Sequence, residues 1–259
     1  FFLPLLLLAS LVIYLFAHNA LHAPAYINIQ KDWFYSINAT LSQFPNLEYN
    51  LTQIGDALVF LSLLSIFLVY APVIWEVLIS ASLITLIVSA VLKNIFAVPR
   101  PAAALNQSSF NIIGDVLPGH SSLPSGHSIT IFTTLTVLLF GFMPKKMNHR
   151  FLWVIGFIAT GLFLAFTRVA VGAHYPLDVF VGGTVGYMCG LAGILFSRRY
   201  KLWAWISNKK YYPVLFLLLL MAGILLIGRI LNEQLPIFYF ALAVLIISLF
   251  KLTYVYLKK

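Results

Sequence analysis

Three separated stretches of this sequence carry residue types that can bind and transfer a phosphoryl group. They occupy residues 93–101, 124–127 and 167–178, each at the edge of a hydrophobic segment. Lysine and arginine can neutralise a phosphate dianion, and histidine can act as a nucleophile or a general acid. We expect the three stretches to meet in one site. Its candidate residues, in chain order, are Lys93, Arg100, Ser125, Gly126, His127, Arg168, His174 and Asp178.

The second stretch is Pro-Ser-Gly-His at the start of an apolar run. Pro124 is compatible with a helix start, where the N–H groups of Ser125, Gly126 and His127 would be unpaired and would favour an anion. Gly126 allows close approach to the backbone, and the Ser125 hydroxyl adds a donor. His127, when protonated, can give a proton to a leaving oxygen. The alternative is a helix cap beside an incidental histidine.

The third stretch places His174 just before a helix whose first turn is marked by Pro176. Asp178 lies one turn into that helix, where it can accept a hydrogen bond from the His174 ring. A carboxylate on one ring nitrogen raises the basicity of the other, so His174 is a candidate nucleophile that would form a phosphohistidine. Asp178 can also serve as an N-terminal cap, and the two roles are compatible.

The cations of the first and third stretches lie near the ends of apolar runs. Charges near a membrane cost several kcal/mol unless they are paired or hydrated, and a bound phosphate would supply the pairing. Arginine can hold phosphate with two parallel hydrogen bonds, which suits Arg100 and Arg168. For Lys93 the alternative is that its ammonium extends to the lipid headgroups.

Composition assigns the chain to the membrane proteins. Of 259 residues, 61% are hydrophobic and 9% are charged, whereas soluble domains have about 25% charged residues. The single cysteine, Cys189, excludes a disulfide framework and a cysteine-based metal site. A net charge of +9 does not by itself indicate nucleic acid, and no nucleic-acid partner is expected.

Windows of about 20 apolar residues predict an all-α, polytopic membrane bundle of about eight spans. The first is expected to be a retained helix rather than a signal peptide, because no basic region precedes it. Residues 1–200 are expected to form the catalytic domain around a six-helix core, and residues 201–259 an accessory hairpin. The expected spans are 2–18, 52–72, 76–97, 126–143, 151–171, 176–197, 212–230 and 235–256.

Loop charges predict which side the three stretches face. Ten basic residues fall on one side of the alternating spans, which is expected to be cytoplasmic. All three stretches then face the opposite, extracytoplasmic side. The ten residues are Lys145, Lys146, Arg150, Arg198, Arg199, Lys201, Lys209, Lys210, Lys258 and Lys259.

The sequence also predicts the positions of two connecting segments and the packing of one helix face. Residues 19–49, with Trp33, Phe34 and Tyr35, are expected to lie at the membrane interface. The polar connection 102–123 is expected to form a wall or lid of the site. A small-residue stripe in the sixth span, formed by Gly182, Gly186 and Gly190, predicts close helix packing.

Taken together, the stretches resemble the type 2 phosphatidic acid phosphatase superfamily. The family motifs are matched by KNIFAVPRP at 93–101, PSGH at 124–127 and TRVAVGAHYPLD at 167–178. One departure is Thr167, which stands before Arg168 where the family has serine; the hydroxyl is kept. The resemblance covers about residues 90–180 by motif and implies a similar helical architecture from 52 to 197.

This resemblance implies a role for each matched residue. His174 would be the nucleophile, Asp178 its orienting partner, and His127 the group that protonates the leaving oxygen. The family needs no metal, and no cofactor is expected here. His120, in the polar connection, is a candidate contact for a second phosphate, and the alternative is an ordinary loop histidine. The phosphate itself would be held by Lys93, Arg100, Ser125, Gly126 and Arg168.

The function expected from these features is that of a lipid phosphatase or pyrophosphatase in a cell membrane. Its partners would be a phosphorylated lipid and the bilayer, with no obligate protein partner. One alternative is a phosphotransferase that passes the phosphoryl group to an acceptor lipid such as lipid A. A second alternative is a non-catalytic phospholipid-binding or transport protein.

Overall fold

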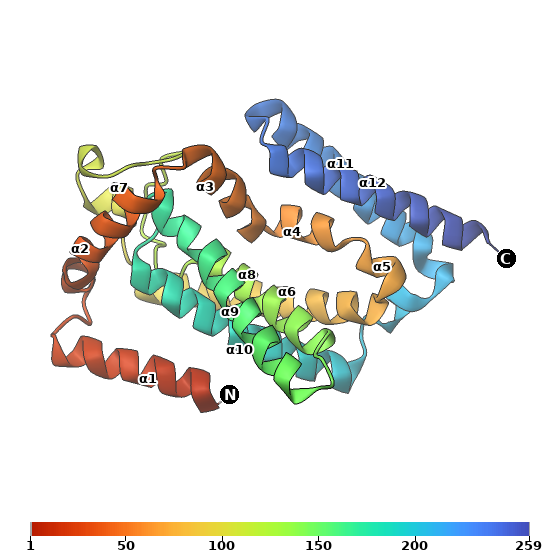
Figure 1. Ribbon diagram of the computed structural model, residues 1–259, viewed down its shortest axis with the longest axis horizontal. Coiled ribbons are helices and arrows are strands. Elements are labelled where there is room, and N and C mark those ends of the chain that lie inside the picture. The colour runs from red at the N-terminus through yellow and green to blue at the C-terminus, as the bar shows by residue number, and fades with distance from the viewer. Residues whose placement is uncertain (1, 259) are drawn as a thin grey trace.

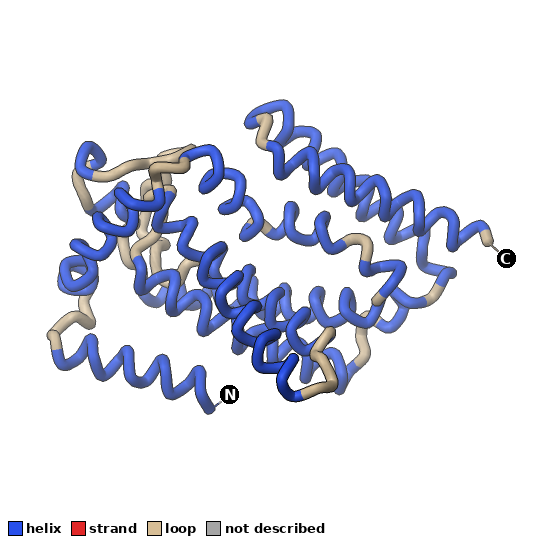
Figure 2. The backbone as a smooth tube through the Cα atoms, in the orientation of Figure 1, coloured by secondary structure: helices blue, strands red, loops and turns tan. Residues whose placement is uncertain are grey.

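The chain is built from helices joined by short loops. The computed structural model describes residues 2–258, and no strand occurs among them (Figures 1 and 2), which confirms the expected all-α fold. The α-helices are α1 (Phe2–Ala17), α2 (Ala23–Leu41), α3 (Pro45–Thr52), α4 (Ala57–Leu64), α5 (Phe67–Tyr70), α6 (Pro72–Phe96), α7 (Pro101–Ala104), α8 (Gly126–Gly141), α9 (Met147–Ala170), α10 (Pro176–Tyr200), α11 (Tyr212–Glu233) and α12 (Pro236–Leu257). The 3-10 helices are η1 (Gln53–Gly55), η2 (Gln107–Ser109), η3 (Ala204–Ser207) and η4 (Lys209–Tyr211).

Five helical segments within the described residues are long and apolar enough to cross a membrane. Two shorter apolar helices, α1 and α8, have 16 residues each and so extend about 24 Å. The protein is therefore a multi-pass membrane protein, while the figure of about eight spans stays a prediction. The five segments are Pro72–Ala104, Met147–Ala170, Pro176–Tyr200, Lys209–Glu233 and Pro236–Leu257.

The segment 52–72, expected as one continuous span, is instead divided into η1, α4 and α5. At the break, the hydroxyl and the backbone N–H of Ser65 both donate to the Ser62 carbonyl, at 2.7 and 3.2 Å. The Leu64 carbonyl accepts a hydrogen bond from the Trp75 indole at 2.7 Å. The expectation was wrong because apolar composition does not record serine hydroxyls that compete for helix carbonyls.

Helices α6, α8, α9 and α10 run side by side in the middle of the molecule (Figure 1). The predicted glycine stripe of α10 lies against α8. A Cβ at Gly182 would come within 2.7 Å of the Ser125 carbonyl oxygen, and one at Gly186 would collide with the Ile129 carbonyl. A Cβ at Gly190 would meet Thr136 at 2.6 Å. The small-residue prediction is confirmed, since the two backbones approach more closely than any side chain permits.

The hairpin of α11 and α12 packs mainly on α4 and α5, and its hydrophobic cluster also includes Trp75 of α6. Its hydrophobic cluster joins Leu226, Phe238 and Leu245 of the hairpin to Val59 of α4 and Leu68 of α5. Residues of α1, α2, α8, α9 and α10 form a different cluster. The hairpin is thus joined to the centre through α4, α5 and the Trp75 side chain of α6.

Residues 19–49 form α2 and the start of α3, and α2 lies near the end of the central helices (Figure 1). Phe34, expected at the membrane interface, is instead fully buried, with its ring centroid 5.4 Å from that of Tyr175 and 5.1 Å from that of Phe110. Trp33 is 58% exposed. The interface prediction was wrong for Phe34 because α2 turns this side chain toward α10.

The two ends of the central bundle differ in character. The C-termini of α6 and α9 and the N-termini of α8 and α10 share one end, where all three candidate stretches lie (Figure 1). The loops 142–146 and 201–211, which carry much of the basic charge, lie at the other end. Lys259 lies outside the described residues. This separation of charge agrees with the expected alternation, while the identity of each side stays a prediction.

Candidate functional site

Helix α6 ends so that the first stretch reaches the N-terminus of α8. Ala97 adopts a left-handed conformation (φ 44°), and its N–H donates to the Lys93 carbonyl at 3.0 Å, which closes the helix. The Lys93 ammonium lies 3.1 Å from the point that a Cβ on Gly126 would occupy. The Arg100 N–H donates to the Gly119 carbonyl at 2.8 Å. Gly126 therefore makes room for the lysine as well as for a ligand.

Ser125 is the N-cap of α8, which begins at Gly126. Its hydroxyl oxygen accepts from the Ser128 N–H at 3.4 Å and from the Ser128 hydroxyl at 2.9 Å. Pro124, expected in the first helical turn, stands before the cap instead. The Ser125 hydroxyl keeps its own hydrogen for donation, so capping and ligand binding are compatible.

The backbone donors at this helix start differ from the prediction in one respect. The Ser125 N–H, expected to be free, donates to the backbone carbonyl of Asp178 at 3.1 Å and so joins the second stretch to the third. Within the described chain no residue accepts from the N–H of Gly126 or of His127. Gly55 of η1 packs on His127, because a Cβ there would lie 2.7 Å from the His127 Cβ.

Arg168 occupies the last turn of α9 and is 6% exposed. Its Nη1 donates to the Thr52 hydroxyl at 2.8 Å, and its carbonyl accepts from the N–H groups of Ala173 and His174 at 3.0 and 3.2 Å. Gly172, with φ 76°, allows the chain to reverse here. The Arg168 Nε is buried and has no hydrogen-bond partner among residues 2–258, so it offers a donor to an anion.

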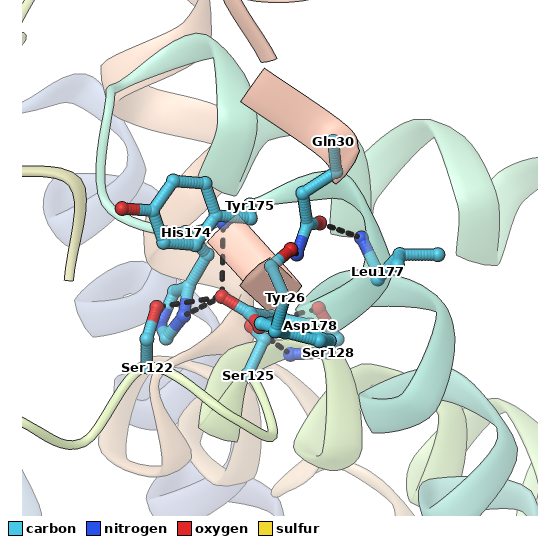
Figure 3. Close-up of polar contacts among 9 residues, drawn as sticks. All are labelled: Tyr26, Gln30, Ser122, Ser125, Ser128, His174, Tyr175, Leu177 and Asp178. Carbon is cyan, nitrogen blue, oxygen red and sulfur yellow. Dashed lines mark hydrogen bonds and ion pairs between the residues drawn. The ribbon is translucent and has the colours of Figure 1, made fainter. Parts of the chain in front are cut away.

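His174 and Asp178 lie close together (Figure 3). The His174 Nδ1 is 3.6 Å from the Asp178 Oδ2, which is within ion-pair range but too long for a hydrogen bond. The same carboxylate oxygen accepts from the Ser122 hydroxyl at 2.6 Å and from the Tyr175 N–H at 2.9 Å. Asp178 thus caps α10 as expected. Its predicted bond to His174 requires a slightly closer approach, which catalytic groups often make only with substrate bound.

The electrostatic surroundings of His174 favour its neutral form. Burial lowers the pKa of His174 well below its usual value, and the charges of Arg100, Arg168 and Lys93 lower it further. The Ser122 backbone acts in the opposite direction. A neutral imidazole is the form that a nucleophile requires, and the charges of all three cations favour it.

Several side chains that contact the site residues lie outside the three stretches. Tyr26 of α2 donates its hydroxyl to the Asp178 Oδ1 at 2.8 Å, Thr52 holds Arg168, and Ser122 brings the end of the 102–123 connection to Asp178. The polar character of that connection had indicated a wall of the site. No signal of spacing pointed to Tyr26 or Thr52, because they are ordinary residues on helices far away in sequence.

Two further features of the site concern His120 and metal binding. His120 is exposed and follows Gly119, whose carbonyl accepts from the Arg100 N–H, so the backbones of His120 and Arg100 are close to each other. Across residues 2–258, no group of three or more His, Cys, Asp or Glu side chains is arranged to hold a metal ion.

The fold and the site together define an all-α, multi-pass membrane protein with histidines, cations and a carboxylate gathered at one end of its helical bundle. Residues 74–202 match the model of the PAP2 superfamily. The chain belongs to this superfamily, the type 2 phosphatidic acid phosphatases that its three stretches resemble.

Individual relatives are similar over different parts of the chain. A lipid A 1-phosphatase from Rhizobium johnstonii is 42% identical over 86 residues, which is 31% of this chain and 31% of that protein. An undecaprenyl-diphosphatase from Sulfolobus acidocaldarius is 27% identical over 161 residues, covering 58% of this chain and 75% of that protein. A crystal structure of Aquifex aeolicus LpxE superposes with a TM-score of 0.53 at 26% identity, over 64% of this chain and 95% of that one. The chain thus spans about a third of the first relative's length and most of the other two.

Proposed function

We propose that this protein is a membrane lipid phosphatase that works through a phosphohistidine on His174. The observation that carries the proposal is the fully buried His174, 3.6 Å from the Asp178 carboxylate, at the end of the bundle that also holds Lys93, Arg100 and Arg168. A phosphate dianion together with the Asp178 carboxylate would nearly balance the charges of Lys93, Arg100 and Arg168. Such a cluster stabilises the charge that spreads over the phosphoryl oxygens during transfer.

In the first proposed step, the Nε2 of His174, the nitrogen that does not face Asp178, attacks phosphorus while the bond from phosphorus to the lipid oxygen breaks. Burial and the charges of Arg168, His174 and Lys93 lower the pKa of His127 well below its usual value, and a bound phosphate dianion acts in the opposite direction. His127, protonated with the substrate bound, gives its proton to that oxygen, and the lipid leaves. In the second step His127 accepts a proton from water, the water oxygen bonds to phosphorus, and the phosphorus–nitrogen bond breaks. Inorganic phosphate is released and both histidines return to their starting forms.

The phosphate would be held by backbone and side-chain donors at the start of α8 together with the cations. The unpaired N–H groups of Gly126 and His127 lie at the positive end of the α8 dipole. The Ser125 hydroxyl and the Arg168 Nε add donors. The site lies at the end of the bundle away from the basic loops, which supports an extracytoplasmic active site in the cell membrane.

The substrate class proposed is a lipid phosphate or diphosphate whose chains stay in the bilayer. Relatives named lipid A 1-phosphatase and undecaprenyl-diphosphatase make lipid A phosphates and undecaprenyl diphosphate the leading candidates. Phosphatidic acid and phosphatidylglycerol phosphate complete the set to be tested. For a diphosphate, we propose that His120 contacts the second phosphate, and His120→Ala should then lower kcat/KM for a diphosphate by about 5-fold and leave a monophosphate unaffected.

Phosphate release from this lipid panel in detergent micelles tests the proposal directly. We expect release from at least one lipid, and a loss of about 1,000-fold or more in His174→Ala. The matched control is His149→Ala, which removes an exposed histidine at the start of α9 and should leave the rate unchanged. Millimolar vanadate should inhibit the wild type, because it mimics five-coordinate phosphorus.

The same assay separates the alternatives. Label that moves from the substrate into a second lipid, with little free phosphate, would identify a phosphotransferase. Binding of a lipid with no turnover by the wild type would identify a non-catalytic binding protein. Full activity of purified His174→Ala would overturn the role proposed for this residue.

A further inference from the structure

Helix α2 presents a row of buried side chains to the site, although it lies outside the region matched by the family model. Positions 26, 30, 34 and 38 are four residues apart, so they share one face of the helix. Their side chains are Tyr26, Gln30, Phe34 and Asn38, with exposures between 0 and 3%. Three of the four are polar, and each of these three makes a hydrogen bond outside α2.

Gln30 and Asn38 hold the backbone of the third stretch on either side of His174. The Gln30 Oε1 accepts from the Leu177 N–H at 2.9 Å, in the first turn of α10 (Figure 3). The Asn38 amide nitrogen donates to the carbonyls of Val169 and Ala170 at 3.0 Å, at the end of α9. These contacts fix α2 relative to the turn that carries His174.

Tyr26 reaches the carboxylate itself. Its hydroxyl donates to the Asp178 Oδ1 at 2.8 Å, whereas the donors from Ser122 and Tyr175 both bond to Oδ2 (Figure 3). Tyr26 is thus the one donor to Oδ1 found among residues 2–258. Burial and the neighbouring carboxylate raise the pKa of Tyr26, so its hydroxyl stays protonated and continues to donate.

A carboxylate held through one oxygen can rotate about its Cβ–Cγ bond, but one held through both cannot. Rotation of Asp178 would move Oδ2 away from the His174 Nδ1, which lies 3.6 Å from it. We propose that Tyr26 is a positioning residue: its hydroxyl fixes the plane of the Asp178 carboxylate so that Oδ2 faces His174. This inference rests on the proposed phosphatase function.

The test compares Tyr26→Phe with the wild type in the lipid phosphatase assay. The substitution removes one oxygen and keeps the ring. We expect kcat to fall by about 10- to 100-fold, because a buried acceptor loses its donor and the carboxylate is released. KM and the inhibition constant of inorganic phosphate should stay within about twofold, since the cations are unchanged. Tyr35→Phe is the matched control: the Tyr35 hydroxyl, on the same helix, meets only the exposed Ser109 hydroxyl at 3.0 Å and should be dispensable.

A second measurement separates positioning from general support of the fold. Ser122→Ala removes a donor from the other oxygen of the same carboxylate. If both hydroxyls orient Asp178, the loss in the double variant should differ by at least about threefold from the product of the two single losses.

The outcomes have distinct meanings. A kcat of Tyr26→Phe within twofold of the wild type overturns the inference alone, and so does a loss that appears equally in KM and in phosphate inhibition. Independent effects of the two substitutions also overturn it. A wild type that releases no phosphate from any lipid overturns the proposed function, and the inference falls with it.

Discussion

Helices α10 and α11 both belong to segments apolar enough to cross a membrane, but they differ in what surrounds them. The α11 segment has the higher mean hydropathy, 2.7 against 1.8 for α10. Yet 56% of an 18-residue apolar stretch of α10 is buried inside the molecule, whereas only 22% of such a stretch in the α11 segment is buried. Hydropathy therefore identifies a span without showing whether it lies inside the bundle.

Small and polar residues make the distinction that hydropathy misses. Asp178 lies in the first turn of α10, whose glycine stripe lies against the backbone at 125–133, in α8 and its N-cap. In α11, a Cβ at Gly223 would meet Leu245 at an ordinary 3.6 Å, and one at Gly228 would meet nothing within 4 Å. Interior helices of membrane proteins carry small residues and functional charges, and lipid-facing helices need neither.

The largest expected effect is the loss of activity on substitution of Asp178, the carboxylate in the first turn of α10. Asp178→Asn should lower kcat by about 10³- to 10⁴-fold, because the carboxylate that faces His174 becomes a neutral amide of the same shape. The readout is phosphate release by the purified variant. Circular dichroism and the thermal midpoint serve to verify that the variant folds. A decrease of less than tenfold would show that Asp178 acts mainly as a helix cap.

Paired glycine substitutions should change stability in opposite directions. Gly186→Ala places a methyl group against the Ile129 carbonyl of α8 and should destabilise the protein by about 1–3 kcal/mol. Gly223→Ala meets no close contact and should stabilise it by about 0.5–1 kcal/mol, because alanine favours helix. Thermal midpoints in detergent provide the comparison. Shifts of the same sign in both variants would contradict the packing difference between α10 and α11.

The pH dependence of activity should reflect the buried end of the central bundle. Free histidine side chains titrate near pH 6.5, but burial and three cations lower the pKa of His174. As the pH falls, the neutral nucleophile should therefore persist below pH 6.5, and kcat/KM should decline only at more acid values. The profile is to be corrected by a parallel titration of the substrate. An acid limb centred at or above pH 6.5 would argue against a neutral, buried His174.

The sequence predicted the parts of this arrangement that depend on local chemistry. The start of α8 at Gly126, the first turn of α10 at Pro176 and the glycine stripe follow from capping, proline geometry and spacing. The break in 52–72 could not be predicted, because it depends on the Ser65 hydroxyl and on an indole from α6. The contact of Tyr26 with Asp178 could not be predicted either, because 152 residues separate the two and only packing brings them together.

The smallest expected effect concerns the charges that connect the hairpin to the rest of the chain. Arg229 of α11 lies 3.5 Å from Asp56, the N-cap of α4, and 3.5 Å from Glu233, while 42% of its side chain is exposed. Ion pairs this exposed contribute at most about 1 kcal/mol. Arg229→Gln should therefore shift the thermal midpoint only slightly and leave kcat within twofold of the wild type. A tenfold loss of activity would instead show that the hairpin acts on the site through α4 and η1, where Gly55 packs on His127. The contrast between a catalytic helix and a supporting one would then have to be abandoned.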